Sequence, residues 1–153
     1  MKASDVMTRD VVSVAPDTSV RKIAAHLLSK GISAVPVVDG AGAPLGIVSE
    51  GDLIGRKEAE CEERQDWWLT ILAEGEEVNR GLLANFNYPR ASDPMSAPVI
   101  TVSEETSLRD IAFILTSRRI KRVPVVRDGR IVGIVSRADL VRALVAPPRL
   151  MPI

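Results

Sequence analysis

The chain contains the stretch Arg119-Ile-Lys-Arg-Val-Pro-Val-Val-Arg-Asp-Gly-Arg-Ile-Val-Gly-Ile-Val-Ser-Arg-Ala-Asp-Leu140. Nearly the same string occurs earlier, as Gly31-Ile-Ser-Ala-Val-Pro-Val-Val-Asp-Gly-Ala-Gly-Ala-Pro-Leu-Gly-Ile-Val-Ser-Glu-Gly-Asp-Leu53. The two copies run in step at an offset of 88 residues, until one extra residue in the first copy reduces the offset to 87. An internal repeat of this kind indicates two copies of one supersecondary unit. Two copies are too few for an open solenoid, so we expect them to close on each other.

Each copy predicts the order β-α-β-β-α. A short apolar strand at 11–14 or 99–102 precedes a helix whose apolar residues recur at i, i+3, i+4 and i+7. The predicted helix stripes are Val20, Ile23, Ala24 and Leu27, and Leu108, Ile111, Ala112 and Leu115. Ser and Thr side chains at 17–19 and 105–107 predict the helix starts.

Two β-branched runs follow each helix and predict a hairpin, for which Asp128-Gly129 is a strong turn signal in the second copy. Pro36 and Pro124 lack an amide hydrogen, which places their strand at a sheet edge or puts them at its start. A final short helix is expected to begin near Asp52 in the first copy and near Asp139 in the second.

Two tandem units, each with a Val-Pro-Val-Val strand and a Gly-Ile-Val-Ser-x-x-Asp turn, resemble a pair of cystathionine-β-synthase (CBS) domains, the arrangement called a Bateman module. The resemblance covers residues 3–56 and 91–145. It implies an α+β fold in which two pseudo-symmetric repeats pack as one module with a helical insert between them. The expected divisions are residues 1–56 and 94–146 for the repeats, 57–93 for the insert and 147–153 for a disordered tail.

Bulk composition gives few further signals. Lys plus Arg equals Asp plus Glu at 20 each, so no net field recruits nucleic acid or an anionic membrane. Cys61 is the single cysteine, which excludes an internal disulfide. Because no signal peptide or long apolar run is present, we expect a cytoplasmic protein.

The insert holds both tryptophans, Trp67 and Trp68, and Asp66 is a candidate cap for a helix that carries them. We interpret this helix chiefly as a cap on the domain or part of a dimer interface. A tryptophan that stacks on a ligand base is the alternative.

The residues do not predict an enzyme. Catalysis needs a base, a nucleophile or a metal held at short range. The sequence offers one histidine, His26, and one cysteine in unrelated contexts, without metal-ligand spacing or a glycine-rich phosphate loop.

The Ser-x-x-Asp turn does predict binding. A strand ends at Ser49 or Ser136 and a helix starts near Asp52 or Asp139, which exposes a hydroxyl, a carboxylate and free amides together. Hydroxyl and amides suit a phosphate, and the carboxylate suits the hydroxyls of a ribose. Simple helix capping explains the same residues equally well.

The CBS resemblance favours the binding interpretation. It implies two quasi-symmetric clefts in which the Ser contacts phosphate and the Asp binds ribose. Apolar residues of both copies would then enclose the adenine: Val12, Val14, Ala34, Val35, Ile100, Val102 and Val123.

The copies differ in charge at this site. Lys121, Arg122 and Arg137 occur where the first copy has Ser33, Ala34 and Glu50. We therefore expect the cleft of Ser136 and Asp139 to bind phosphate more tightly, with Lys121 and Arg122 contributing to one or both phosphate sites.

The predicted function is a non-catalytic, homodimeric sensor of an adenosine nucleotide, with AMP, ADP or ATP favoured and NAD or S-adenosylmethionine as alternatives, and with no metal required. The resemblance does not name the downstream protein. A second interpretation is an interaction module with vestigial clefts that docks an enzyme or transporter through the insert. Nucleic-acid binding through the arginine-rich second repeat is weaker, since no aromatic residues interleave with the basic ones.

Overall fold

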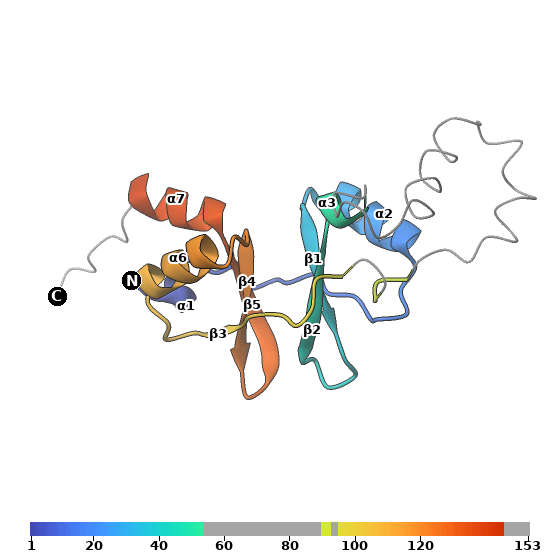
Figure 1. Ribbon diagram of the computed structural model, residues 1–153, viewed down its shortest axis with the longest axis horizontal. Coiled ribbons are helices and arrows are strands. Elements are labelled where there is room, and N and C mark those ends of the chain that lie inside the picture. Colours follow the sequence, from blue (N-terminus) through green and yellow to red (C-terminus); the bar gives the residue numbers. More distant parts are fainter. Residues whose placement is uncertain (54–89, 93–94, 146–153) are drawn as a thin grey trace, which may run out of the picture.

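The computed structural model describes residues 1–53, 90–92 and 95–145. The predicted Trp67-Trp68 helix, Cys61 and the predicted tail lie outside these residues. Two halves make up the described part, each with a small sheet and helices on its outer side, and the two sheets lie next to each other in the middle (Figure 1). The expected α+β fold with two repeats of one unit is confirmed.

The first half contains α2 (Val20–Lys30), β1 (Ala34–Val38), β2 (Pro44–Ser49) and α3 (Glu50–Leu53). Strands β1 and β2 pair antiparallel. The Ser19 hydroxyl accepts a hydrogen bond from the Lys22 amide at 3.2 Å, so the predicted helix start is confirmed. The helix ends at Gly31 in the left-handed conformation, with φ at 61°.

The second half contains β3 (Val102–Ser103), α6 (Leu108–Ser117), β4 (Arg122–Arg127), β5 (Arg130–Ser136) and α7 (Arg137–Val145). Its sheet has the order β3-β4-β5. Asp128 and Gly129 both have positive φ, at 52° and 77°, as expected for the predicted hairpin turn. The Ser107 hydroxyl caps α6 as Ser19 caps α2.

The proline prediction holds only in part, because β4 is the middle strand of its sheet. Pro124 is tolerated there because β3 is two residues long and pairs with Val125 and Val126, beyond the proline. Strand β1 is an edge strand of a two-stranded sheet, as expected. The missing amide hydrogen therefore leaves no ladder bond unmade in either half.

The first segment of each repeat crosses to the other half. Thr8 exchanges backbone hydrogen bonds with Ile134 of β5 at 2.9 and 3.0 Å, while Ser96 exchanges them with Ile47 of β2 at 2.9 and 3.2 Å. The predicted strand at 11–14 is consequently reduced to an isolated bridge between Val14 and Val37, because residues 9–13 span the distance between the two sheets.

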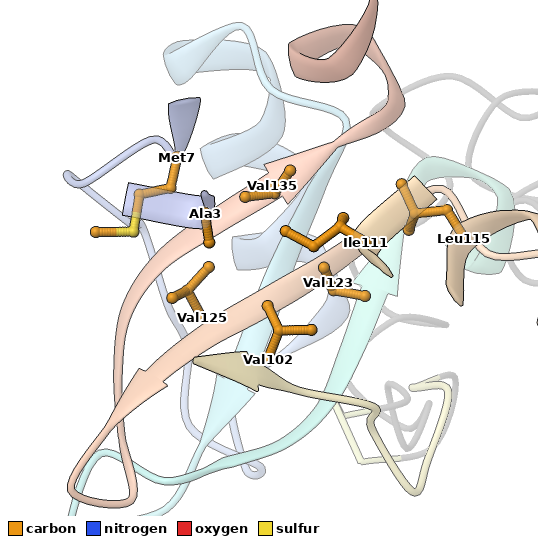
Figure 2. Packing of buried hydrophobic residues seen from close by; sticks show 8 residues of the cluster. All are labelled: Ala3, Met7, Val102, Ile111, Leu115, Val123, Val125 and Val135. Carbon is orange, nitrogen blue, oxygen red and sulfur yellow. The ribbon is translucent and has the colours of Figure 1, made fainter. Parts of the chain in front are cut away.

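Each hydrophobic core contains side chains from both repeats. The helix α1 (Ala3–Val6) and Met7 pack in the second half, where Ala3 and Met7 lie next to Val125 and Val135 (Figure 2). The remaining members of that cluster are Val102, Ile111, Leu115 and Val123. Ala91, at the start of the second repeat, is buried in the core of the first half. Neither repeat therefore closes its core alone, which confirms that the copies close on each other.

Candidate functional site

A cleft of about 320 Å³ opens where the two halves meet. One side comes from the end of β2 and the start of α3, and the other from residues 96–100 and the segment before β4 of the second repeat. The lining residues are Ile47, Ser49, Gly51, Asp52, Ser96, Pro98, Val99, Ile100, Arg119, Ile120, Lys121 and Arg122. The crossing of the chain at Ser96 brings the second repeat against β2 and so creates the cleft.

The Ser49–Asp52 turn forms one wall. The Oδ2 atom of Asp52 accepts hydrogen bonds from the Ser49 amide at 2.9 Å and the Ser49 hydroxyl at 3.0 Å. The Ser49 Oγ atom in turn lies 3.2 Å from the Asp52 amide nitrogen. The capping interpretation is thus correct for these bonds. Among the described residues, no hydrogen bond occupies Asp52 Oδ1, which leaves that acceptor for a ligand.

Three cations form the opposite wall, namely Arg119, Lys121 and Arg122. Arg122 is half-buried, and its Nη2 atom donates to the Ser33 hydroxyl of the other repeat at 2.9 Å. Burial lowers the pKa of the Arg122 guanidinium, and the nearby carboxylates of Asp52 and Glu50 oppose this effect. Arg122 remains charged, because an arginine pKa lies far above neutral pH.

Apolar side chains complete the cleft. Ile47, Val99, Ile100 and Ile120 contribute branched aliphatic surface beside the polar wall. Such surface suits a flat aromatic ring, because pockets for small ligands combine apolar walls with a few placed polar groups. The cleft can therefore accept a molecule with a planar base, vicinal hydroxyls and an anionic group.

The matching turn in the second half has the same local geometry with one difference. Asp139 accepts hydrogen bonds from the Ser136 amide at 2.8 Å and the Ser136 hydroxyl at 3.0 Å. Its Oδ1 atom, however, accepts a hydrogen bond from Arg142 of α7. Asp139 is 7% exposed, the only charged side chain among the described residues that is buried. The Oδ1 atom, which has no hydrogen bond in Asp52 among the described residues, is thus already occupied in Asp139.

The structure places the predicted cations in one cleft. Lys121 and Arg122, which the sequence-based hypothesis assigned to one or both phosphate sites, line the cleft of Ser49 and Asp52. They precede β4, and the cleft lies between that segment and the other repeat. Arg137 begins α7, where its amide donates to the Lys121 carbonyl at 2.9 Å.

Several predicted base contacts lie elsewhere. Of the seven, Ile100 lines the cleft, and Val12 and Ala34 are partly buried outside it. Val14 and Val35 belong to the core of the first half, and Val102 and Val123 to the core of the second. These four pack in the cores with side chains of α2 and α6.

Sequence reasoning missed two residues that matter here. Arg119 occupies the position that matches Gly31 of the first copy, and Arg142 has Gly55 at the matching position. A comparison of the two copies at these positions was the available signal. Among the described residues, no group of three His, Cys, Asp or Glu side chains is arranged to hold a metal ion.

Comparisons with known proteins agree with this architecture. The family model for the CBS domain matches residues 3–58 and 91–146. The chain is 34% identical over 144 residues to the chloroplastic CBS domain-containing protein CBSX1 of Arabidopsis thaliana, covering 88% of this chain and 59% of that one. It is 27% identical to an uncharacterised protein of Methanopyrus kandleri, covering 93% and 62%. The chain thus spans less than two thirds of the length of these relatives.

The crystal structure of CBSX2 in complex with AMP superposes with a TM-score of 0.70 at 28% identity, covering 94% of this chain and 96% of that one.

None of the helices within residues 1–53 and 95–145 combines the length and hydropathy needed to cross a lipid bilayer.

Proposed function

Because this chain belongs to the CBS domain family and carries two copies of the domain, we propose that it is a non-catalytic regulatory module that binds an adenosine nucleotide between the copies. The observation that carries the proposal is the cleft in which a carboxylate, three cations and an apolar wall face one another. Its volume of about 320 Å³ lies at the lower end of the range for small-molecule sites. A relative solved with AMP supports the choice of an adenosine compound.

Each part of the ligand has a partner in this proposal. Asp52 Oδ1 accepts from the ribose hydroxyls, since a carboxylate is purely an acceptor. Lys121 and Arg122 bind the phosphate groups, because charge-assisted bonds to phosphate are short and strong. Ile100 and the neighbouring aliphatic side chains pack against the adenine. The cleft of Ser136 and Asp139 is then the weaker one, because Arg142 already binds the ribose acceptor.

The proposal extends to assembly and output. Phe113 on α6 is 71% exposed and Leu144 on α7 is 84% exposed, and exposed apolar side chains of this size mark contact surfaces when they gather in patches. We propose that a homodimer forms through these helices in the cytoplasm. Nucleotide binding then changes the affinity of the dimer for a downstream protein. The size of this change is set by the difference in nucleotide affinity between two conformational states of the dimer.

The direct test measures the affinity of the chain for AMP, ADP, ATP, NAD and S-adenosylmethionine by isothermal titration calorimetry. GTP, which carries a different base, is the control ligand. We expect Asp52→Asn to lower the affinity for the preferred adenosine compound about tenfold to a hundredfold, because a hydrogen bond to a charged group is lost. Asp139→Asn is the matched control, since Asp139 has the same bonds to its own turn, and it should change affinity less than about threefold.

Equal losses in both variants would refute the assignment of the dominant site. If no adenosine compound binds the wild-type chain, the sensor function fails. The docking of a partner enzyme or transporter, with unused clefts, then becomes the better proposal.

A further inference from the structure

The charges of the cleft are unbalanced. Arg119, Lys121 and Arg122 line it, and Asp52 is the one carboxylate among its lining residues. Among the described residues, the ion pairs join Lys2 to Glu105, Arg127 to Glu104 and Arg142 to Asp139, so none of the three cleft cations takes part in one. The three cations outnumber the carboxylates of Asp52 and Glu50 that act on Arg122, and this excess of positive charge favours an anion that contacts the cations together.

The three cations are spread along the chain and differ in depth. Arg122 is half-buried and held by Ser33, whereas Lys121 and Arg119 are exposed. Residues 119 and 122 are separated by up to roughly 10 Å of extended chain. One phosphate group presents its oxygens in one small region, so it contacts fewer of the three cations than a chain of phosphates does. A chain of phosphates can follow the series from Arg122 outward.

The backbone of Arg119 points to the same conclusion. Its φ of 53° is left-handed, which is costly for a residue with a Cβ atom, and the equivalent position of the first repeat holds Gly31. Glycine would adopt this conformation without strain. Strained residues gather at ligand sites, where the side chain has a task that compensates for the strain. Arg119 therefore has a side chain in the cleft at a position where the fold alone favours glycine.

The equivalent segment of the first repeat lacks these charges. It reads Gly31-Ile32-Ser33-Ala34, so none of the positions that match Arg119, Lys121 and Arg122 carries a positive charge. The positive series is a feature of one cleft and not of the repeated unit. Any preference among anionic ligands that these cations cause must therefore belong to the cleft of Asp52.

We infer that this cleft selects adenosine polyphosphates over the monophosphate, with Arg122 on the proximal phosphate and Lys121 and Arg119 on the distal ones. This inference rests on the proposed function and specifies the ligand class of that site. Arg119 is then the residue that determines the specificity for phosphate number. The cleft of Ser136 and Asp139 has no corresponding preference for phosphate number.

The test compares AMP, ADP and ATP by titration calorimetry in magnesium-free buffer, for the wild-type chain and for Arg119→Gly. We expect the wild-type chain to bind ATP at least ~tenfold more tightly than AMP. Arg119→Gly should lower ATP affinity by about tenfold while AMP affinity changes less than about twofold. Arg118→Gln is the control, because Arg118 is the exposed neighbour with an ordinary backbone and does not line the cleft.

Arg119→Gly also keeps the test interpretable, because glycine relieves the left-handed strain and the variant should unfold at no lower temperature than the wild type. If AMP and ATP bind equally well, or if Arg119→Gly weakens both alike, the preference for polyphosphates is refuted while the adenosine site stands. If no adenosine compound binds at all, both the proposed function and the preference for polyphosphates are refuted. Competition by inorganic tripolyphosphate against AMP supports the inference, and failure to compete contradicts it.

Discussion

Gly46 and Gly133 occupy equivalent positions in β2 and β5, and each lies directly under the segment that crosses from the other repeat. A Cβ atom on Gly46 would lie 2.8 Å from the Ser96 carbonyl oxygen and 2.9 Å from the Met95 sulfur. On Gly133 it would lie 2.5 Å from the Met7 sulfur. Glycine is needed for the close approach at Gly46, because the crossing backbone leaves no space for a methyl group, whereas at Gly133 the nearest atoms belong to the flexible Met7 side chain.

We therefore expect Gly46→Ala to lower the free energy of unfolding by about 1–3 kcal/mol, as overpacking does in a closed site. Chemical denaturation with urea measures the change. Gly40→Ala is the control, since a Cβ atom there meets nothing within 4 Å, and it should be close to neutral. Equal stability of the two variants would contradict the close approach of Ser96 to β2.

At the scale of elements, a bidentate ion pair joins β4 to the turn before α6. The Nε atom of Arg127 lies 2.6 Å from Glu104 Oε2, and its Nη2 atom binds Glu104 Oε1. The hydrogen bond from Arg127 lowers the pKa of the Glu104 carboxyl below its ordinary value of 4.5. The folded state therefore favours the ionised carboxylate.

A group whose pKa is lower in the folded state stabilises the fold above its unfolded pKa, and the contribution disappears as the pH falls through the folded pKa. Glu104→Gln should thus reduce stability at pH 7 and remove part of the loss that the wild type suffers below about pH 4.5. Unfolding free energies across the acid range measure this. Arg127→Leu should abolish the same pH dependence, and a wild-type pH profile in either variant would show that the pair is not formed.

At the scale of the whole molecule, the exchange of N-terminal segments makes the two halves one cooperative unit. Met7 belongs to the first repeat in sequence but is buried in the core of the second half. We expect Met7→Ala to cost about 2–5 kcal/mol. It should also leave a single unfolding transition, because the loss spreads to both halves.

Amide hydrogen exchange would show which half Met7→Ala destabilises. We expect faster global exchange of amides in both β1 and β4. Met95→Ala is the symmetric control, since Met95 packs against the core of the first half. Separate transitions for the two halves would contradict a single unit.

Assembly is also a property of the whole molecule. If a homodimer forms through α6 and α7, Phe113→Glu should convert it to monomers, because a charge would then be buried at the interface. Light scattering after size-exclusion chromatography measures the mass. Thr116→Glu, also exposed on α6, is the control and should leave the mass unchanged. A wild-type monomer at all concentrations would refute the dimer.

Local features of this protein were determined by the sequence itself. The caps at Ser19 and Ser107, the turn at Asp128-Gly129 and the hydrogen-bonded turns of Ser49 and Asp52 were all predictable. Each depends on contacts between residues a few positions apart, which residue type and spacing encode directly. The duplicated pattern also determined the family and the order of elements, except for helix α1 and the predicted strand at 11–14.

Only the tertiary structure decided which copy each first segment joins, and so which cations face which carboxylate. The two copies have nearly the same sequence pattern, so local sequence does not tell whether Thr8 pairs with β2 or with β5. Long-range packing determines that it pairs with β5. The crossing brings Lys121 and Arg122 to Asp52, and the fold of α7 brings Arg142 to Asp139. Two similar turns thereby become chemically unequal, because a side chain's partner depends on the path of the whole chain and not on its own neighbours.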